Sequence, residues 1–126
     1  MRAVDTNVLV RLLVQDDSRP VAAATQWVQS GAWVSTLALA ETLRVLSEVY
    51  HRAPAQIIAA VETLLNHQNL TLQDPEAVSA ALAIFQGNPG FGFSDCLSLE
   101  LARKAGHLPL GTFDRSFAKL NGAHRL

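Results

Sequence analysis

The chain has 126 residues, 49% of them apolar and 17% charged, which excludes a disordered segment and is enough for one domain with a core. The net charge of −1 excludes the strong basic excess that is typical of nucleic-acid binders, so phosphate contacts would need a local patch or a metal ion. The single cysteine, Cys96, excludes an internal disulfide and suits a reducing compartment. No apolar run reaches the roughly 18 residues of a membrane-spanning helix, and charged residues interrupt the N-terminal apolar stretch. We therefore expect a cytoplasmic protein with no membrane contact, whose residues 1–126 form a single domain.

The first half of the chain alternates short apolar strands with amphipathic helices. We expect strands at residues 2–5, 32–35 and 70–72. Between them we expect a helix from Thr6, its cap, to about Val14, one from Asp17 or Ser18 to near Gly31, one from Thr36 to Arg52, and one marked by Ile57, Val61 and Leu64. Leu39, Leu43, Leu46 and Tyr50 mark the inner face of the third of these helices.

The second half continues the alternation. We expect a helix that starts at Asp74-Pro75-Glu76 and buries Val78, Ala81, Leu82 and Phe85, followed by a loop at residues 87–92. The next helix is expected to be capped by Ser94, to bury Leu97, Leu101 and Ala105, and to end at Gly106. After it we expect a strand at 108–112, a helical turn within 115–120 and an edge strand at 123–126. Strands that alternate with helices indicate an α/β fold with a parallel sheet.

Four of the eleven acidic residues differ from the others, most of which fall on predicted polar faces or turns. Asp5 and Asp114 each follow a predicted strand, whereas Glu41 and Asp95 lie in the first turns of helices. In a parallel sheet, the carboxyl ends of the strands and the starts of the following helices share one edge, where ligands of open α/β sheets bind. We therefore expect these four acids to meet at that edge.

Four carboxylates this close would repel one another unless cations were bound between them. Oxygen ligands favour Mg²⁺ or Mn²⁺, which keep several waters and still reach phosphate oxygens. Such ions can orient a water, lower its pKa and neutralise charge on a leaving oxygen, and a nearby carboxylate can act as general base. The pattern thus predicts phosphodiester hydrolysis, with no need for a serine, cysteine or histidine nucleophile.

Each acid also has a purely structural interpretation. Asp95 is a favourable first-turn acid, Glu41 can pair with Arg44 three residues on, and Asp114 can cap the turn over Ser116 and Phe117. Asp5 is harder to explain structurally, because apolar residues flank it.

Four motifs in order resemble those of the PIN-domain nucleases. They are Asp5-Thr6-Asn7 after an apolar strand, Leu39-Ala40-Glu41, Phe93-Ser94-Asp95 at the start of a helix, and Thr112-Phe113-Asp114 after a strand. Length and element order are most similar to the VapC-type ribonuclease toxins of bacterial toxin–antitoxin pairs. The resemblance covers essentially the whole chain.

The resemblance implies a three-layer α/β/α sandwich with a central, mostly parallel sheet. It also implies endonucleolytic cleavage of RNA with Mg²⁺ or Mn²⁺, inhibition by a cognate antitoxin and assembly into a homodimer. By residue-wise match, the metal-binding and catalytic acids are Asp5, Glu41, Asp95 and Asp114, and Thr6, Asn7 and Thr112 are the polar neighbours that orient them. Glu100 is left out, because it lies roughly 140° around the helix from Asp95.

Several other residues admit two interpretations. Arg11, four residues after Asn7, contacts substrate phosphate or is a solvated arginine. Phe91 or Phe93 stacks on a base or packs in the core. The four histidines lack the spacing of metal ligands, and we expect Cys96 to be a small core residue.

Rival functions are weighed against the same residues. A haloacid-dehalogenase-type phosphatase needs a second acid two residues after Asp5, where this chain has Asn7. A phosphate receiver domain needs a lysine after a late strand, and none follows the strand that ends near Thr112. An inactive PIN-like binding module and a housekeeping PIN nuclease that acts on another nucleic acid stay open.

Overall fold

A sheet of three parallel strands organises the first of two units in the computed structural model, which describes all 126 residues and divides into Met1–Pro75 and Glu76–Leu126. The strands are β1 (Arg2–Val4), β2 (Ala32–Val34) and β3 (Leu70–Leu72), paired in that order. Val4 lies opposite Val34, and Val34 opposite Leu72. The three strands and their parallel pairing are as the sequence predicts.

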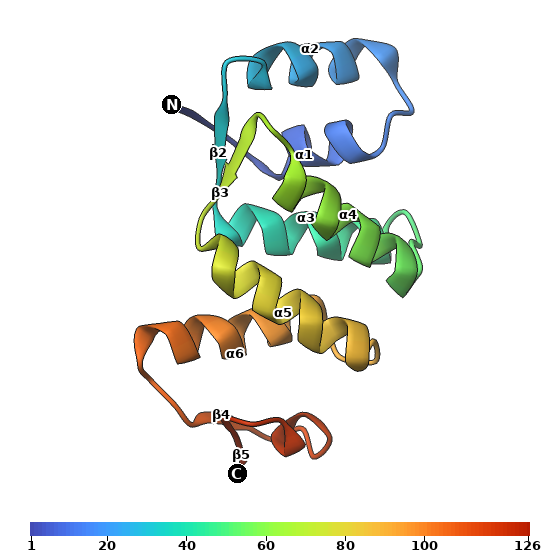
Figure 1. Ribbon diagram of the computed structural model, residues 1–126. Helices are drawn as coiled ribbons and strands as arrows, with labels where there is room; N and C mark the ends of the chain where they lie inside the picture. The colour runs from blue at the N-terminus through green and yellow to red at the C-terminus, as the bar shows by residue number, and fades with distance from the viewer. The chain divides into compact units, whose positions relative to one another are not determined.

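Two helices connect each strand of this sheet to the next, because parallel neighbours need a long crossover connection (Figure 1). They are α1 (Thr6–Leu13) and α2 (Ser18–Val28) between β1 and β2, and α3 (Thr36–Glu48) and α4 (Pro54–Asn66) between β2 and β3. Helix α1 packs against α2 and α3, α3 packs against α4, and α4 packs against β3. The start of α1 is thereby held beside α3.

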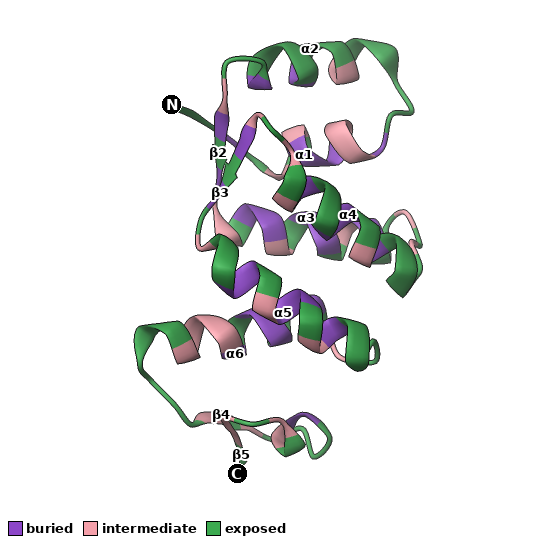
Figure 2. Ribbon diagram, viewed as in Figure 1, coloured by how far each residue is buried: buried purple, intermediate pink, exposed green.

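The core of this unit follows the predicted periodicity. Leu39, Leu43 and Leu46 are buried along one stripe of α3, and Ala32 and Val34 are buried on one face of the sheet (Figure 2). Helix α3 ends at Glu48 and not at Arg52, so the expected core position of Tyr50 lies outside it. The backbone turns at His51, which has a φ of 52°.

The second unit holds two helices followed by a small two-stranded sheet. Its elements are α5 (Pro75–Gly87), α6 (Phe93–Ala105), β4 (Leu110–Thr112), the 3-10 helix η1 (Phe117–Lys119) and β5 (Ala123–Arg125). The rings of Phe85 and Phe93 meet edge to face at 5.9 Å and join α5 to α6. Strands β4 and β5 pair in parallel, with Thr112 opposite Arg125. None of the helices in either unit combines the length and apolar composition needed to cross a bilayer.

Two predicted helix caps are wrong by one or two residues. Asp5, not Thr6, caps α1, because its backbone is extended and its carboxylate accepts the free backbone N–H of Val8. Gly92, not Ser94, is the cap residue of α6, because the buried Phe93 already belongs to the helix. Asp5 and Thr6 are both able to cap, as are Gly92 and Ser94, and packing decides between the two residues at each start.

The inner face of α6 is also rotated relative to the prediction. Leu97 is buried as expected, but Leu101 is only half-buried and Ala105 is exposed. The buried positions instead include Phe93, Cys96 and Leu99. Since the helix begins earlier than expected and Phe93 anchors it, the apolar stripe is set from Phe93.

Leu39→Ala tests the core of the first unit. Leu39 is 1% exposed, and its truncation is expected to lower the free energy of unfolding by about 2–5 kcal/mol, through lost burial and a residual cavity. Urea denaturation followed by circular dichroism measures the change. Leu37→Ala is the matched control, because Leu37 lies on the same helix and is 69% exposed; its effect is expected to stay within about 0.5 kcal/mol.

Candidate active site

Asp5 lies at the junction of β1 and α1, where it is exposed and has a structural task of its own. Its backbone is extended (φ −98°, ψ −179°), and its Oδ1 accepts a hydrogen bond from the backbone N–H of Val8 at 3.1 Å. This bond satisfies one of the N–H groups that a helix start leaves without an intrahelical partner. Oδ2 accepts no hydrogen bond and remains open to a ligand.

Glu41 is connected to this junction by Thr6. The Thr6 hydroxyl, on the first residue of α1, donates to Oε2 of Glu41 on α3 at 3.0 Å. Arg44, which the structural interpretation of Glu41 offered as its partner, instead pairs with Glu48 at 3.2 Å, so that interpretation is wrong. Because Thr6 directly follows Asp5 in the chain, this bond holds the Glu41 carboxylate one residue away from Asp5.

The same edge of the sheet also fixes the start of α3. Ser35, directly after β2, accepts a hydrogen bond from the backbone N–H of Ala38 through its Oγ. Gln73, directly after β3, accepts from the backbone N–H of Thr36 at 3.0 Å and from its hydroxyl at 3.3 Å. Because β1, β2 and β3 are parallel and in register, Asp5 leaves the sheet at this edge as well. The edge therefore carries Asp5 and, through Thr6, Glu41.

Asp114 in the second unit is a turn cap, as one of its two predicted interpretations states. Its Oδ1 accepts from the backbone N–H groups of Ser116 and Phe117, both at 2.9 Å. The Oγ1 of Thr112, at the end of β4, accepts from the backbone N–H of Asp114 at 3.0 Å. Oδ2 of Asp114 makes no hydrogen bond, so this carboxylate, like that of Asp5, has one fixed oxygen and one open oxygen.

Asp95 lies in the first turn of α6, exposed, with no hydrogen bond or ion pair to its carboxylate. A Cβ at Gly92 would lie 3.4 Å from Asp95 Oδ2, an ordinary van der Waals contact, so the carboxylate lies directly beside the cap residue of the helix. Phe91, four residues before Asp95, meets Phe117 edge to face at 5.3 Å. Phe117 also donates its backbone N–H to Asp114, so this ring pair joins the segments that carry Asp95 and Asp114.

Cys96, next to Asp95, is fully buried. Burial raises the pKa of its thiol to about 11, and the charges of Asp95 and Glu100 act in the same direction. A thiol with this pKa stays protonated near neutral pH, so Cys96 is suited neither to act as a nucleophile nor to bind a metal ion. The expected role of a small core residue is confirmed.

Arg11 and Asn7 stand apart from the carboxylates. Arg11 lies in the last turn of α1, at the end opposite Asp5, and pairs with Asp16 at 3.2 Å. This contact directs the guanidinium toward the loop after α1 and not toward the edge of the sheet. Asn7 is exposed and makes no hydrogen bond, so the backbone of Val8 and not Asn7 holds the Asp5 carboxylate.

The aromatic residues near the acids divide into packed and exposed rings. Phe93 packs against Phe85 as expected, and Phe91 packs against Phe117. Phe113, between Thr112 and Asp114, is 81% exposed and offers a flat face of the kind that stacks on a nucleobase. The sequence signal was its position: an aromatic residue after a strand, flanked by Asp114.

The donor set suits a hard divalent cation, because every candidate ligand is a carboxylate. Asp5 and Glu41 belong to the first unit, and Asp95 and Asp114 to the second. No group of three or more Asp, Glu, His or Cys side chains forms a metal-ligating cluster in the structure. The meeting of all four carboxylates stays a prediction.

Asp5→Ala separates the capping role of Asp5 from any role in chemistry. Loss of the Val8 hydrogen bond is expected to lower the free energy of unfolding by about 1 kcal/mol, whereas Asp5→Asn, which keeps a side-chain acceptor, is expected to change it by only a few tenths. Urea denaturation of the two variants measures the difference. Equal stability of both variants would contradict a capping role.

Comparison with known proteins assigns the chain to a protein family. A family model for the PIN domain matches residues 2–123. No curated protein sequence matches the chain. Among solved structures, the chain is similar to the crystal structure of Mycobacterium tuberculosis VapC20, described as a sarcin-ricin loop cleaving toxin. The sequence identity is 18% and the TM-score 0.45, over 98% of this chain and 97% of that chain. Because the family model spans nearly the entire sequence, the chain belongs to the PIN-domain family, with its three-layer α/β/α fold and mostly parallel sheet.

Proposed function

We propose that the protein is a metal-dependent endoribonuclease that hydrolyses RNA phosphodiester bonds, and that it is the toxin of a toxin–antitoxin pair. Membership of the PIN-domain family supports nuclease activity. The observation that carries the proposal further is the 3.0 Å hydrogen bond from Thr6 to Glu41. It holds a carboxylate of α3 beside Thr6, the residue after Asp5, at the edge of a parallel sheet where ligands of α/β folds bind.

We take Mg²⁺ or Mn²⁺ as the cofactor and Asp5, Glu41, Asp95 and Asp114 as the acids that hold it. When bound, the ion supplies Lewis acidity, which activates a water and stabilises charge on the leaving oxygen. The carboxylates contribute oxygen ligands in place of water, and their negative charge makes the site selective for cations.

Hydrogen bonds from the chain hold three of these carboxylates in place before any ligand arrives. Asp5 and Asp114 each use Oδ1 for a helix or turn cap and keep Oδ2 open. Glu41 uses Oε2 for the Thr6 hydroxyl and keeps Oε1 open. Fixing one oxygen restricts the side-chain rotamer, which reduces the entropy lost when the other oxygen binds.

The partners proposed for the chain are an RNA substrate, a cognate antitoxin and a second copy of the chain in a homodimer. They rest on the four motifs that resemble those of PIN-domain nucleases, and on a length and element order that are similar to those of VapC-type toxins. A cytoplasmic location accords with such partners. An inactive module that binds nucleic acid or protein would share the motifs but would not cleave, and a housekeeping nuclease would cleave without arresting growth.

Carboxylate-to-amide variants test the chemistry with little change in shape. Asp5→Asn, Glu41→Gln, Asp95→Asn and Asp114→Asn each keep a side-chain oxygen and lose a charge. Each is expected to lower Mn²⁺-dependent cleavage of a structured RNA by at least about 100-fold, since changes in residues that only support metal ligands already cost 10–100-fold. The measurement is the initial rate at fixed RNA, with and without EDTA.

Asp17→Asn is the matched control for this series. Asp17 is also the cap of a helix, α2, and accepts the backbone N–H of Arg19, but it lies on the loop after α1. Its cleavage rate is expected to equal that of the wild type. Cleavage that persists in EDTA, or that survives in Asp5→Asn, would contradict the mechanism.

Induced expression tests the toxin role separately. Wild-type protein is expected to arrest bacterial growth, because it would cut essential RNA, and Asp95→Asn is expected not to. Asp95 is the acid of choice because its carboxylate makes no structural hydrogen bond, so this substitution removes charge alone. Colony counts and soluble protein level are measured together. If the wild type and Asp95→Asn arrested growth equally at equal protein level, an active-site cause of the arrest would be rejected. If the wild type cleaved RNA but did not arrest growth, a housekeeping nuclease would be favoured.

A further inference from the structure

The segment that carries Asp114 is held at two separate places, one on the loop directly before α6 and one near the far end of α6. Near the acids, the ring of Phe91 meets the ring of Phe117. At the other end of α6, Arg103 contacts the loop that leads into β5. A single contact would leave this segment free to pivot, whereas two contacts fix its orientation on the helix.

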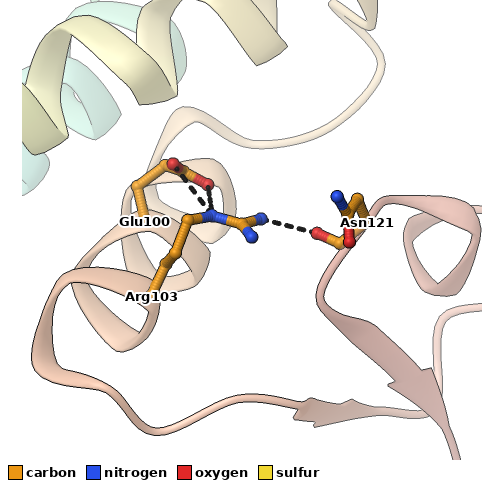
Figure 3. Close-up of polar contacts among 3 residues, drawn as sticks. All are labelled: Glu100, Arg103 and Asn121. Carbon is orange, nitrogen blue, oxygen red and sulfur yellow. Dashed lines mark hydrogen bonds and ion pairs between the residues drawn. The ribbon is translucent and has the colours of Figure 1, made fainter.

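Arg103 makes this second contact with a guanidinium that is bonded on two sides (Figure 3). Its Nε donates to both carboxylate oxygens of Glu100, at 3.3 and 3.2 Å. Its Nη2 donates to the backbone carbonyl of Asn121 at 2.6 Å. The Glu100 side chain is only 11% exposed, so the charge of Arg103 neutralises a carboxylate that has little access to water.

The backbone at Gly122 fits closely against this guanidinium. A Cβ at that position would lie 3.0 Å from Nη2 of Arg103 and 3.3 Å from Nη1. The φ of Gly122 is +93°, a conformation that residues with a side chain rarely adopt. The absence of a side chain therefore allows the Asn121 carbonyl and the guanidinium to meet.

A continuous run of bonds leads from this contact to Asp114. The carbonyl of Gly122 accepts the backbone N–H of Leu110 at 2.8 Å, and β5 then pairs with β4 along its length. Strand β4 ends at Thr112, whose hydroxyl oxygen accepts the backbone N–H of Asp114. Displacement of the Asn121 loop would thus be transmitted to the carboxylate of Asp114.

We infer that Arg103 is a positioning residue, which sets the Asp114 carboxylate relative to Asp95 by clamping the Asn121 loop onto α6. The inference rests on the proposed function, because it assigns both acids to metal binding. Arg103 touches neither acid and acts through Asn121, Gly122 and β4. Arginine suits the task because its planar fork donates in two directions at once, whereas lysine offers a single ammonium centre.

The test compares Arg103→Lys with the wild type in the full chain. Lysine keeps the charge that Glu100 needs but cannot reach both partners in the same geometry. Calorimetric titration with Mn²⁺ alone is expected to give a dissociation constant about 10-fold weaker than that of the wild type. Cleavage measured against Mn²⁺ concentration is expected to shift in the same way, with most of the maximal rate restored at saturating metal.

Arg44→Lys is the matched control, because Arg44 also pairs with a glutamate on its own helix, four residues away, and both side chains are exposed. It is expected to bind Mn²⁺ like the wild type. The double variant Arg103→Met with Glu100→Gln removes the clamp without leaving a buried charge, and it is expected to show the same weaker affinity as Arg103→Lys.

The outcomes separate the inference from the proposed function. The inference alone would be overturned if the wild type bound Mn²⁺ and cleaved RNA, and if both clamp variants folded and bound Mn²⁺ with an affinity within twofold of that of the wild type. A lower melting temperature with unchanged Mn²⁺ affinity would do the same, because it would give Arg103 a merely structural role. Wild type that neither binds Mn²⁺ nor cleaves RNA would overturn the proposed function, and the inference with it.

Discussion

The unpaired backbone N–H groups at the start of a helix or turn are the constraint on which the candidate site depends. Such groups need an acceptor, which a side chain can supply where the chain leaves a parallel strand and enters a helix at the edge of the sheet. Here Asp5 and Ser35 do so after β1 and β2, and Asp114 does so for the turn after β4. A carboxylate has two oxygens, so Asp5 and Asp114 can satisfy the backbone with one and a ligand with the other. Capping and ligand binding are thus compatible in the same residue.

Element type and order could be predicted from the sequence because they depend on local pattern. Periodic apolar residues predicted α3, α4 and α5, and Gly106 predicted the end of α6. In the structure Gly106 does end this helix, with a φ of +82°. Caps could not be predicted to the residue, since Asp5 and Thr6 are both competent acceptors and only the packing of α1 decides between them. The inner face of α6 was misassigned for a related reason, because the anchoring Phe93 lies before the expected start of the helix.

The acids of the candidate site could be named from the sequence, but the contacts that orient them could not. Thr6 and Glu41 are 35 residues apart, and Arg103 and Asn121 are 18 apart. Neither pair follows a helical or strand repeat, and the second involves a backbone carbonyl, which carries no sequence signal. Local rules instead paired Glu41 with Arg44, whose guanidinium bonds Glu48. Only the packing of α1 on α3 brings Thr6 to Glu41.

Helix α6 carries two acids, Asp95 and Glu100, in different surroundings. Asp95 and Glu100 both act on the thiol of Cys96 between them, so both carboxylates influence the same region of the helix. Glu100 is largely shielded from solvent and its two oxygens are bonded to Arg103, whereas Asp95 is exposed and unbonded. Arg103 therefore neutralises the charge of Glu100, whereas the carboxylate of Asp95 has no ion-pair partner. A carboxylate in the first turn of a helix also lies at the favourable end of the helix dipole. Under the proposed function, the arginine that clamps the C-terminal segment therefore also leaves Asp95, and not Glu100, for the metal ion.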